Sequence, residues 1–116
     1  MLDVDAATFD LAPALAGFKS QGYARLGRVV GEKTLSALGQ RVDDLMSARV
    51  RHEGLFFQRD SPTGRYQDLE FGKGFEGPSN DYRKIEKLEI DPLFRAFIGN
   101  ALHERIARAQ IGRAHV

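Results

Sequence analysis

The sequence predicts a mixed α+β fold, in which helices and short strands share one domain. Apolar side chains recur at three- and four-residue spacing over residues 32–49, which indicates an amphipathic helix. Residues 23–30 alternate with a period near two, as in a half-buried strand. At 116 residues the chain is one domain or part of one, with a core that buries roughly 65% of the unfolded surface.

A helix and then a strand are expected at the start of the chain. Residues 8–20 are predicted to be helical, because Pro13 lies near the start, where its missing N–H is harmless, and Gly22 follows the end. The strand over residues 23–30 comes next. The apolar face of the helix over residues 32–49 is expected to contain Leu35, Leu38, Val42, Leu45 and Met46.

Extended chain is expected in the middle of the sequence. Residues 55–58 are predicted to form a strand, residues 60–64 a turn, and residues 65–71 a second extended segment. Residues 72–81 are predicted to be a loop. Residues 82–90 suit either a strand or a helix, and we favour the strand.

Two helices are expected at the end of the sequence. Asp91 is the predicted N-cap of the first and Pro92 its first residue. Its apolar side would comprise Leu93, Phe94, Phe97 and Ile98. Gly99 and Asn100 are expected to end it. The apolar residues of the final helix are Leu102, Ile106 and Ala109.

Composition excludes several classes of function. The chain has no cysteine, so disulfides, thiolate catalysis and cysteine-based zinc sites are excluded. Its net charge is +1, its charges are interspersed, and its basic stretch at residues 95–113 contains Glu104, so no nucleic-acid partner is expected. The start lacks a signal peptide and no run approaches about 18 apolar residues, so we expect a cytoplasmic protein without membrane contact.

No metal site is predicted within this chain, because a metal needs several ligands that converge. The histidines are His52, His103 and His115. His52 and His103 each stand beside a glutamate, and adjacent side chains point in different directions on a strand or a helix. We therefore expect them to be surface residues. The carboxylates of Asp43, Asp44, Glu86 and Glu89 are likewise expected to be solvated.

Residues 72–77 match the G-x-G-x-x-G pattern of dinucleotide sites. That mechanism requires a preceding strand and a helix that begins immediately afterwards. Turn-forming residues 78–81 (PSND) follow instead, so we predict a loop and not a nucleotide site. The phenylalanines at positions 56, 57, 94 and 97 are expected to pack in the core.

Three segments in succession resemble the N-terminal region of the phytanoyl-CoA dioxygenase family. They are residues 18–26 (FKSQGYARL), 82–88 (YRKIEKL) and 91–98 (DPLFRAFI), and a helix that ends at Ile111 and Gly112 follows them. Order and spacing match over nearly the whole chain, so residues 1–110 are expected to be the N-terminal part of such a domain. The resemblance implies N-terminal helices and the first strands of an incomplete double-stranded β-helix, the jelly-roll fold.

The resemblance also implies an activity. Enzymes of this family are Fe(II)- and 2-oxoglutarate-dependent dioxygenases, so the full-length protein would hydroxylate a small organic or acyl substrate. Two histidines and one Asp or Glu hold the iron in such enzymes. In the family these ligands, and the arginine that holds the cosubstrate, follow the last segment matched here. The chain by itself is therefore expected to bind neither iron nor 2-oxoglutarate tightly and to be inactive.

One functional residue is implied within the chain. The family often places a lysine close to 2-oxoglutarate in the extended segment before the Asp-Pro-Leu-Phe-like helix, and Lys84 is the best match, with Arg83 second. A dianionic cosubstrate needs fixed cations near its carboxylates. The alternative is that Lys84 and Arg83 only form surface ion pairs with Glu86 or Glu89.

Residues 111–116 (IGRAHV) have an explanation outside the protein itself. The DNA string atc gga aga gca cac gtc encodes them, and this string resembles a common short-read sequencing adapter. The codon of Gln110 would supply the two preceding bases. We therefore expect residues 111–116 to be a non-native tail that does not contribute to the fold.

An alternative function is not enzymatic. The chain would be a small helical interaction module that docks a partner through an apolar stripe. That stripe would contain Leu93, Phe94, Phe97, Leu102 and Ile106. If the chain is instead part of a jelly-roll, unpaired strand edges are expected to make it marginally stable or prone to aggregate.

Overall fold

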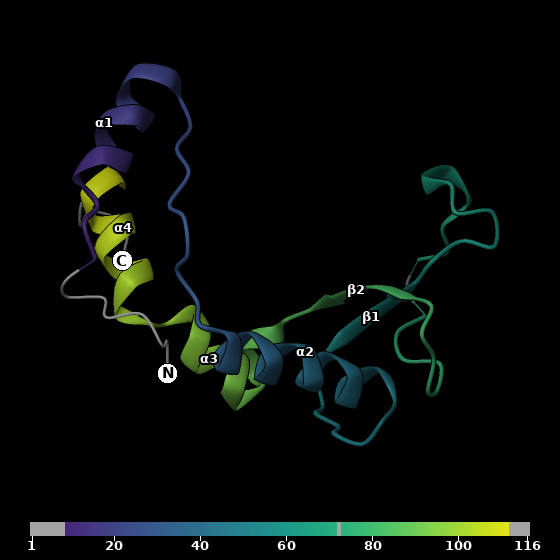
Figure 1. Ribbon diagram of the computed structural model, residues 1–116. Coiled ribbons are helices and arrows are strands. Elements are labelled where there is room, and N and C mark those ends of the chain that lie inside the picture. Colours follow the sequence, from purple (N-terminus) through teal and green to yellow (C-terminus); the bar gives the residue numbers. More distant parts are fainter. Residues whose placement is uncertain (1–8, 72, 112–116) are drawn as a thin grey trace. The chain divides into compact units, whose positions relative to one another are not determined.

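The computed structural model describes residues 9–71 and 73–111 and contains both helices and strands (Figure 1). The elements are α1 (Ala12–Gln21), α2 (Glu32–Met46), β1 (Phe56–Arg59), η1 (Tyr66–Asp68), β2 (Tyr82–Glu86), η2 (Leu88–Ile90), α3 (Pro92–Ile98) and α4 (Ala101–Ile111), where η marks a 3₁₀ turn. The strands β1 and β2 form an antiparallel sheet, so the α+β prediction is confirmed. The tail predicted at residues 111–116 lies outside the described residues, apart from the backbone of Ile111.

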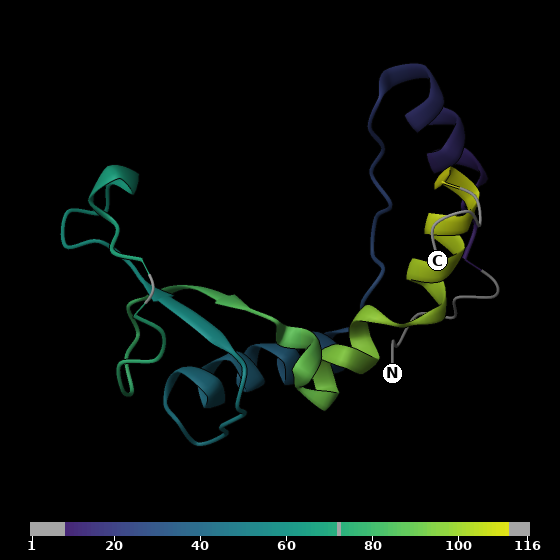
Figure 2. The same ribbon diagram turned by 180° about the vertical axis from the view of Figure 1, so that it is seen from behind.

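The chain divides into two compact units, which are described separately. The first contains the residues up to Ser36 together with those from Ala96 onward, and the second is Ala37–Arg95. Within the first unit α1 and α4, the purple and the yellow-green helix in Figure 2, both line one apolar hollow, and Arg105 Nη1 donates a hydrogen bond to the carbonyl of Phe9 at 2.9 Å. None of the helices that the structure describes has both the length and the apolar character required to cross a membrane.

Helix α1 confirms the first predicted helix with a later start. It begins at Ala12, and the Asp10 carboxylate accepts a hydrogen bond from the Ala12 N–H at 3.1 Å. Pro13 lies in the first turn, as expected. Gly22 ends the helix at φ +84°, a left-handed conformation that glycine adopts without strain, and its N–H donates to the Phe18 carbonyl.

The strand predicted over residues 23–30 is wrong. This segment belongs to no helix or strand, and Gly27 interrupts it at φ +75°. A strand is stabilised by hydrogen bonds to a neighbour, and the only strands in the described part of the chain, β1 and β2, pair with each other. Alternation along residues 23–30 therefore has no partner strand to stabilise it.

Helix α2 confirms the long amphipathic helix but ends at Met46, three residues earlier than predicted. Ala48 has a positive φ of 65°, which an α-helix does not accommodate, so the helix stops before it. On the predicted apolar face Leu45 is completely buried and Leu38 is nearly so. Leu35, by contrast, is exposed.

An aromatic cluster forms the core of the second unit. Phe57 on β1 and Tyr82 on β2 are buried with Leu45. The Phe57 ring lies 5.0 Å from the rings of both Tyr82 and Phe75, measured between centroids, and Phe75 stacks on Tyr82 at 5.6 Å. Such contacts add about 0.5–1.5 kcal/mol per pair to the burial of the rings. The strand predicted at residues 55–58 and the core position of Phe57 are confirmed.

The second extended segment, predicted at residues 65–71, is wrong. It contains the 3₁₀ turn η1, in which the Asp68 and Leu69 N–H groups bond the carbonyls three residues earlier. The Asp68 carboxylate also accepts hydrogen bonds from Thr63 and Arg65, which fold the segment back on the preceding turn. Hydrogen bonds of these local polar side chains therefore stabilise a turn in this segment in place of the extended conformation.

The predicted strand at residues 82–90 is confirmed only over β2. After Glu86 the chain turns at Lys87, which has φ +67°, and continues as η2. The break predicted at Gly99 and Asn100 separates α3 from α4. Asn100 caps α4, since its side-chain oxygen accepts a hydrogen bond from the His103 N–H at 3.0 Å.

The buried carboxylate of Asp91 joins three segments of the second unit. Its Oδ1 accepts hydrogen bonds from the N–H groups of Leu93 and Phe94 at 2.9 and 3.3 Å, which confirms the predicted N-cap of α3. Its Oδ2 accepts a hydrogen bond from Arg41 Nη1 on α2 at 2.7 Å. The same oxygen lies 2.8 Å from Nε2 of His52, in the segment after α2. One side chain thus connects both helices and the chain that follows α2.

These contacts lower the pKa of Asp91. Burial is the largest single influence and opposes ionisation, but the hydrogen bonds from Arg41, His52 and the two backbone N–H groups outweigh it together. The pKa in the folded protein therefore lies below the ordinary value of 3.8. A carboxyl whose pKa is depressed by folding stabilises the fold above its unfolded-state pKa and loses this effect as the pH falls through the folded-state pKa.

Replacing Asp91 by Ala is expected to lower the free energy of unfolding by about 2–4 kcal/mol, because the N-cap is lost and Arg41 and His52 lose their buried acceptor. Urea denaturation followed by circular dichroism measures this change. Asp43→Ala is the matched control, since Asp43 is an exposed carboxylate on α2, and its effect is expected to stay within about 0.5 kcal/mol. Equal stability of the two variants would contradict the role given to Asp91.

The stability advantage of the wild-type chain over Asp91→Asn is expected to depend on pH. It is largest above about pH 4 and shrinks as the pH falls below that value, because the native carboxylate becomes protonated. Urea midpoints of both proteins between pH 7 and pH 3 measure it. The other carboxylates are present in both proteins and cancel in the difference, so a difference that stayed constant over this range would exclude an ionised Asp91.

Candidate functional site on the β1–β2 hairpin

The hairpin contains one irregularity, and it lies at a predicted site residue. Phe57 pairs with Ile85 and Gln58 with Lys84, but the next residue of β1, Arg59, pairs with Tyr82. Arg83 is therefore an extra residue without a partner on β1, which is a β-bulge. Bulges of this kind redirect side chains and are frequent next to functional sites.

The bulge sorts the side chains of β2 onto two faces. Tyr82 and Ile85, three positions apart, both pack with the aromatic cluster. Arg83 and Lys84 are both exposed and lie on the side of Gln58. We call this second side the cationic face, and it comprises Gln58, Tyr66, Arg83, Lys84 and Glu86.

On this face the guanidinium of Arg83 is held by neutral groups. Its Nη1 donates a hydrogen bond to Oε1 of Gln58 at 3.0 Å, and its Cζ lies 6.0 Å from the ring centroid of Tyr66. Gln58 is only 4% exposed and donates in turn to the carbonyl of Glu70 at 3.4 Å. Within the described part of the chain Arg83 has no carboxylate partner.

Lys84 is arranged differently. Its Nζ lies 2.9 Å from a carboxylate oxygen of Glu86, and both side chains are nearly half exposed. The pairing with Glu86 that we considered as the alternative is therefore present for Lys84. For Arg83 neither Glu86 nor Glu89 is the partner, and the Glu89 carbonyl instead accepts a hydrogen bond from Arg95.

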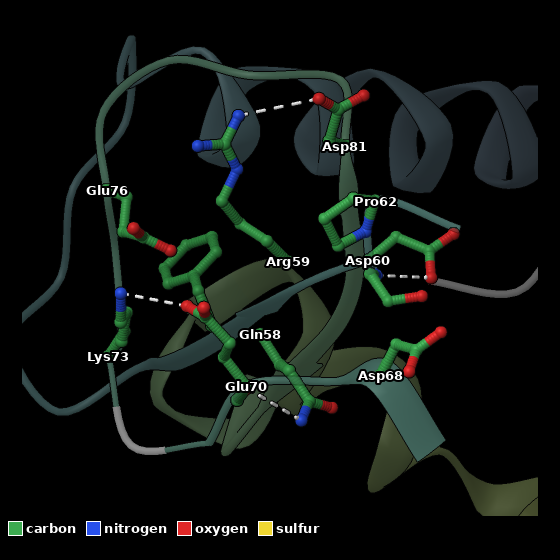
Figure 3. Close-up of a pocket in the computed structure, with 11 residues that line it drawn as sticks. Gln58, Arg59, Asp60, Pro62, Asp68, Glu70, Lys73, Glu76 and Asp81 are labelled. Carbon is green, nitrogen blue, oxygen red and sulfur yellow. Dashed lines mark hydrogen bonds and ion pairs between the residues drawn. The ribbon is translucent and has the colours of Figure 1, made fainter. Parts of the chain in front are cut away.

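A polar hollow of about 480 Å³ lies beside β1 and shares Gln58 with the cationic face (Figure 3). Its acidic lining residues are Asp60, Asp68, Glu70, Glu76 and Asp81. Figure 3 shows Lys73 reaching toward Glu70 and Arg59 toward Asp81, with separations of 2.8 and 3.4 Å. The hydrogen bond from Lys73 lowers the pKa of Glu70 and in return raises the pKa of Lys73. Neither Arg83 nor Lys84 lines this hollow.

The described histidines are part of local hydrogen-bond networks. His52 bonds the buried Asp91 and is one-quarter exposed, so our expectation of a simple surface residue is wrong for it. Spacing gives no hint of this contact, because the two residues lie 39 positions apart. His103 packs edge-on against Phe97 and its Nδ1 lies 2.8 Å from Asn100. In the described part of the chain no three His, Cys, Asp or Glu side chains form a group that could hold a metal ion.

The glycine-rich segment forms a loop, as predicted. Gly72 lies outside the described residues, and the rest leads into β2 without a helix. Phe75 joins the aromatic cluster, and the Tyr82 hydroxyl accepts a hydrogen bond from the Glu76 N–H and donates one to the Gly77 carbonyl. The Tyr82 hydroxyl thus anchors the loop to β2. The loop is followed by this strand and not by the helix N-terminus that a dinucleotide site needs.

The apolar stripe considered for partner docking is not uniformly accessible. Leu102 is completely buried, and the other four side chains are half-buried. In the first unit Ile106 lines an apolar hollow of about 350 Å³ together with residues of α1 and of the segment after it. The largest exposed apolar side chains are Phe18, Tyr23, Leu35, Tyr66, Phe71 and Ile98.

Comparison with known proteins identifies no relative of this chain: no family model matches it, and neither a curated protein nor a solved structure does.

Replacing Tyr82 by Phe is expected to lower the free energy of unfolding by about 1–2 kcal/mol, because the Glu76 N–H loses its acceptor. Urea denaturation measures the loss, and hydrogen exchange should show faster exchange at the Glu76 amide. Tyr66→Phe is the matched control, since Tyr66 is 71% exposed and keeps its ring beside Arg83. If both variants were equally stable, the hydroxyl of Tyr82 would not anchor the loop.

Proposed function

We propose that this chain is the N-terminal part of an Fe(II)- and 2-oxoglutarate-dependent dioxygenase of the phytanoyl-CoA dioxygenase type, which hydroxylates a small organic or acyl substrate. The observation that carries the proposal is the succession of three sequence segments at residues 18–26, 82–88 and 91–98. An exposed Arg-Lys pair lies in the second of them, and residues 85–90 separate it from the Asp-Pro helix of the third.

The positions of these segments in the fold support the proposal. Residues 18–26 contain the end of α1 and its Gly22 cap, and the long helix α2 follows. Residues 82–88 contain β2, and residues 91–98 contain α3 with its Asp91 cap. The resemblance implies a helix, a strand, a long helix, an extended segment and a capped helix in this order. The chain has all of these except the strand, which was expected at residues 23–30.

The chemistry of the cationic face supports the same proposal. 2-Oxoglutarate carries two carboxylates, and a guanidinium binds a carboxylate with two parallel hydrogen bonds. Arg83 and Lys84 are exposed on a strand whose opposite face is packed in the core, so their positions are fixed by the hairpin. A rigid strand is a better support for such cations than a loop.

The iron does not fit the described residues, because they contain no suitable group of three ligands. The resemblance assigns the two histidines and the carboxylate to a later part of the polypeptide. We therefore assign no step of the reaction to this chain. In the complete domain, further strands of the double-stranded β-helix would pair with the edges of β1 and β2, which bond only each other in the described residues.

The test is to extend the reading frame of the native gene beyond Gln110 and to express the complete polypeptide. We expect a His-x-Asp pair and a second histidine downstream, and conversion of 2-oxoglutarate to succinate when Fe(II) is supplied. Replacing the first of these histidines by Ala should reduce succinate formation by at least about 100-fold, because an iron ligand is lost. A native polypeptide without these ligands, or one that binds no Fe(II), would refute the proposal.

A further inference from the structure

Helix α1 is apolar on every side but is only partly covered. Residues 12–18 of this helix contain no polar side chain, and they span almost two turns. A helix that is apolar all round is normally buried. No residue of α1 is buried, however, and Phe18 is 42% exposed. Within the described part of the chain, α1 therefore leaves apolar surface open.

Part of this surface lines the apolar hollow of about 350 Å³ in the first unit. Leu11, Ala14, Leu15 and Phe18 contribute to it at three- and four-residue spacing, which places them along one side of α1. Ile106 of α4 also lines the hollow, and so does the segment that follows α1. A wall with this spacing suits a further helix, whose apolar residues recur at the same intervals.

Uncompensated positive charge is found in the same unit. Its basic residues outnumber its acidic ones among the described positions: Lys19, Arg25, Arg28, Lys33, Arg105 and Arg108 against Asp10, Glu32 and Glu104. Glu32 and Glu104 already pair with Arg28 and Arg108, and Asp10 accepts a hydrogen bond from a backbone N–H. Lys19 and Arg25 form no ion pair with any described residue.

Lys19 and Arg25 stand next to the residues that line the hollow. Lys19 follows Phe18 directly, and Arg25 lies between Ala24 and Leu26, which are lining residues like Phe18. Both basic side chains are exposed and neither lines the hollow itself. The surface thus has an apolar centre with positive charge beside it, and it complements an occupant that has an apolar centre and acidic margins.

We propose that the hollow of the first unit is a docking site for an acidic amphipathic helix of a protein partner. The apolar residues of the partner enter the hollow, and its carboxylates lie beside Lys19 and Arg25. A bilayer surface is a poorer match, because binding to it requires apolar side chains that protrude into the lipid, whereas this surface is hollowed. The docking site does not depend on the oxygenase activity proposed above.

The experiment measures the binding of a fluorescein-labelled synthetic helix of about 18 residues, with leucines at three- and four-residue spacing and glutamates beside them. Fluorescence anisotropy is followed as the 116-residue chain is added, together with the methyl NMR signals of Leu15 and Ile106. We expect a Kd on the order of tens of micromolar and a shift of both methyl signals. A second peptide, with lysines in place of the glutamates, should bind at least about 10-fold more weakly.

Two matched pairs of variants test the charge and the apolar wall separately. Lys19→Glu should weaken binding of the acidic peptide at least about 5-fold, and Lys87→Glu, which reverses an exposed charge in the second unit, less than about 2-fold. Phe18→Ala should also weaken it at least about 5-fold. Phe71→Ala should leave it unchanged, because Phe71 is an exposed side chain of the second unit. Circular dichroism should show that all four variants are folded, since each replaces an exposed side chain.

Equal binding of the two peptides would overturn the inference, as would undiminished binding by folded Lys19→Glu or folded Phe18→Ala. Self-association that Phe18→Ala abolishes, measured by sedimentation, would identify a second copy of the chain as the occupant and reject the partner helix. Binding to phosphatidylserine vesicles without any response to the acidic peptide would reject it in favour of a lipid surface. A complete polypeptide that lacks iron ligands would reject the oxygenase and leave the docking site unaffected.

Discussion

The ionised carboxylate of Asp91 is the interaction on which the second unit depends most. It is completely buried, yet its two oxygens contact four polar groups: two backbone N–H groups at the start of α3, Arg41 on α2, and His52 in the following segment. A buried charge is costly unless it is fully hydrogen-bonded, so these segments have to keep their positions together. Because β2 leads through η2 directly into Asp91, the end of the hairpin is fixed by the same residue.

The hairpin, held at one end by Asp91, has two faces with different kinds of side chain. Its buried face is an aromatic cluster of Phe57, Phe75 and Tyr82, and its other face carries Arg83 and Lys84. A two-stranded sheet alone has little stability in water, so the packing of one face is what makes the other face a defined surface. The bulge at Arg83 places both Tyr82 and Ile85 on the buried face, although they are three positions apart. The short strand β2 therefore contributes side chains to both faces.

The candidate site was only partly predictable. The resemblance to a known family drew attention to residues 82–88 and favoured Lys84, because a lysine is the residue type expected there. Which cation keeps its charge uncompensated depends on neighbours that lie far away in the sequence, such as Gln58 for Arg83, 25 positions earlier. The contact between His52 and Asp91 was missed for the same reason, since it joins residues 39 positions apart. Pattern and spacing report the local backbone and carry no information on such pairings.

The sequence by itself determined the helices, because these depend on neighbouring residues: the Asp91 cap, Gly22 as the left-handed terminator, and the three- and four-residue spacing in α2. The start of α1, the end of α2 and the Asn100 cap of α4 were not predicted. The sequence also determined the turn after β1 and the loop before β2. Only the tertiary structure decided which extended segments become strands, because a strand is stabilised by hydrogen bonds to a partner: residues 56–59 pair with residues 82–86, while residues 23–30 have no partner strand in the described part of the chain. The bulge that aims Arg83 follows from that pairing and from the burial of Tyr82 and Ile85 on one side of it.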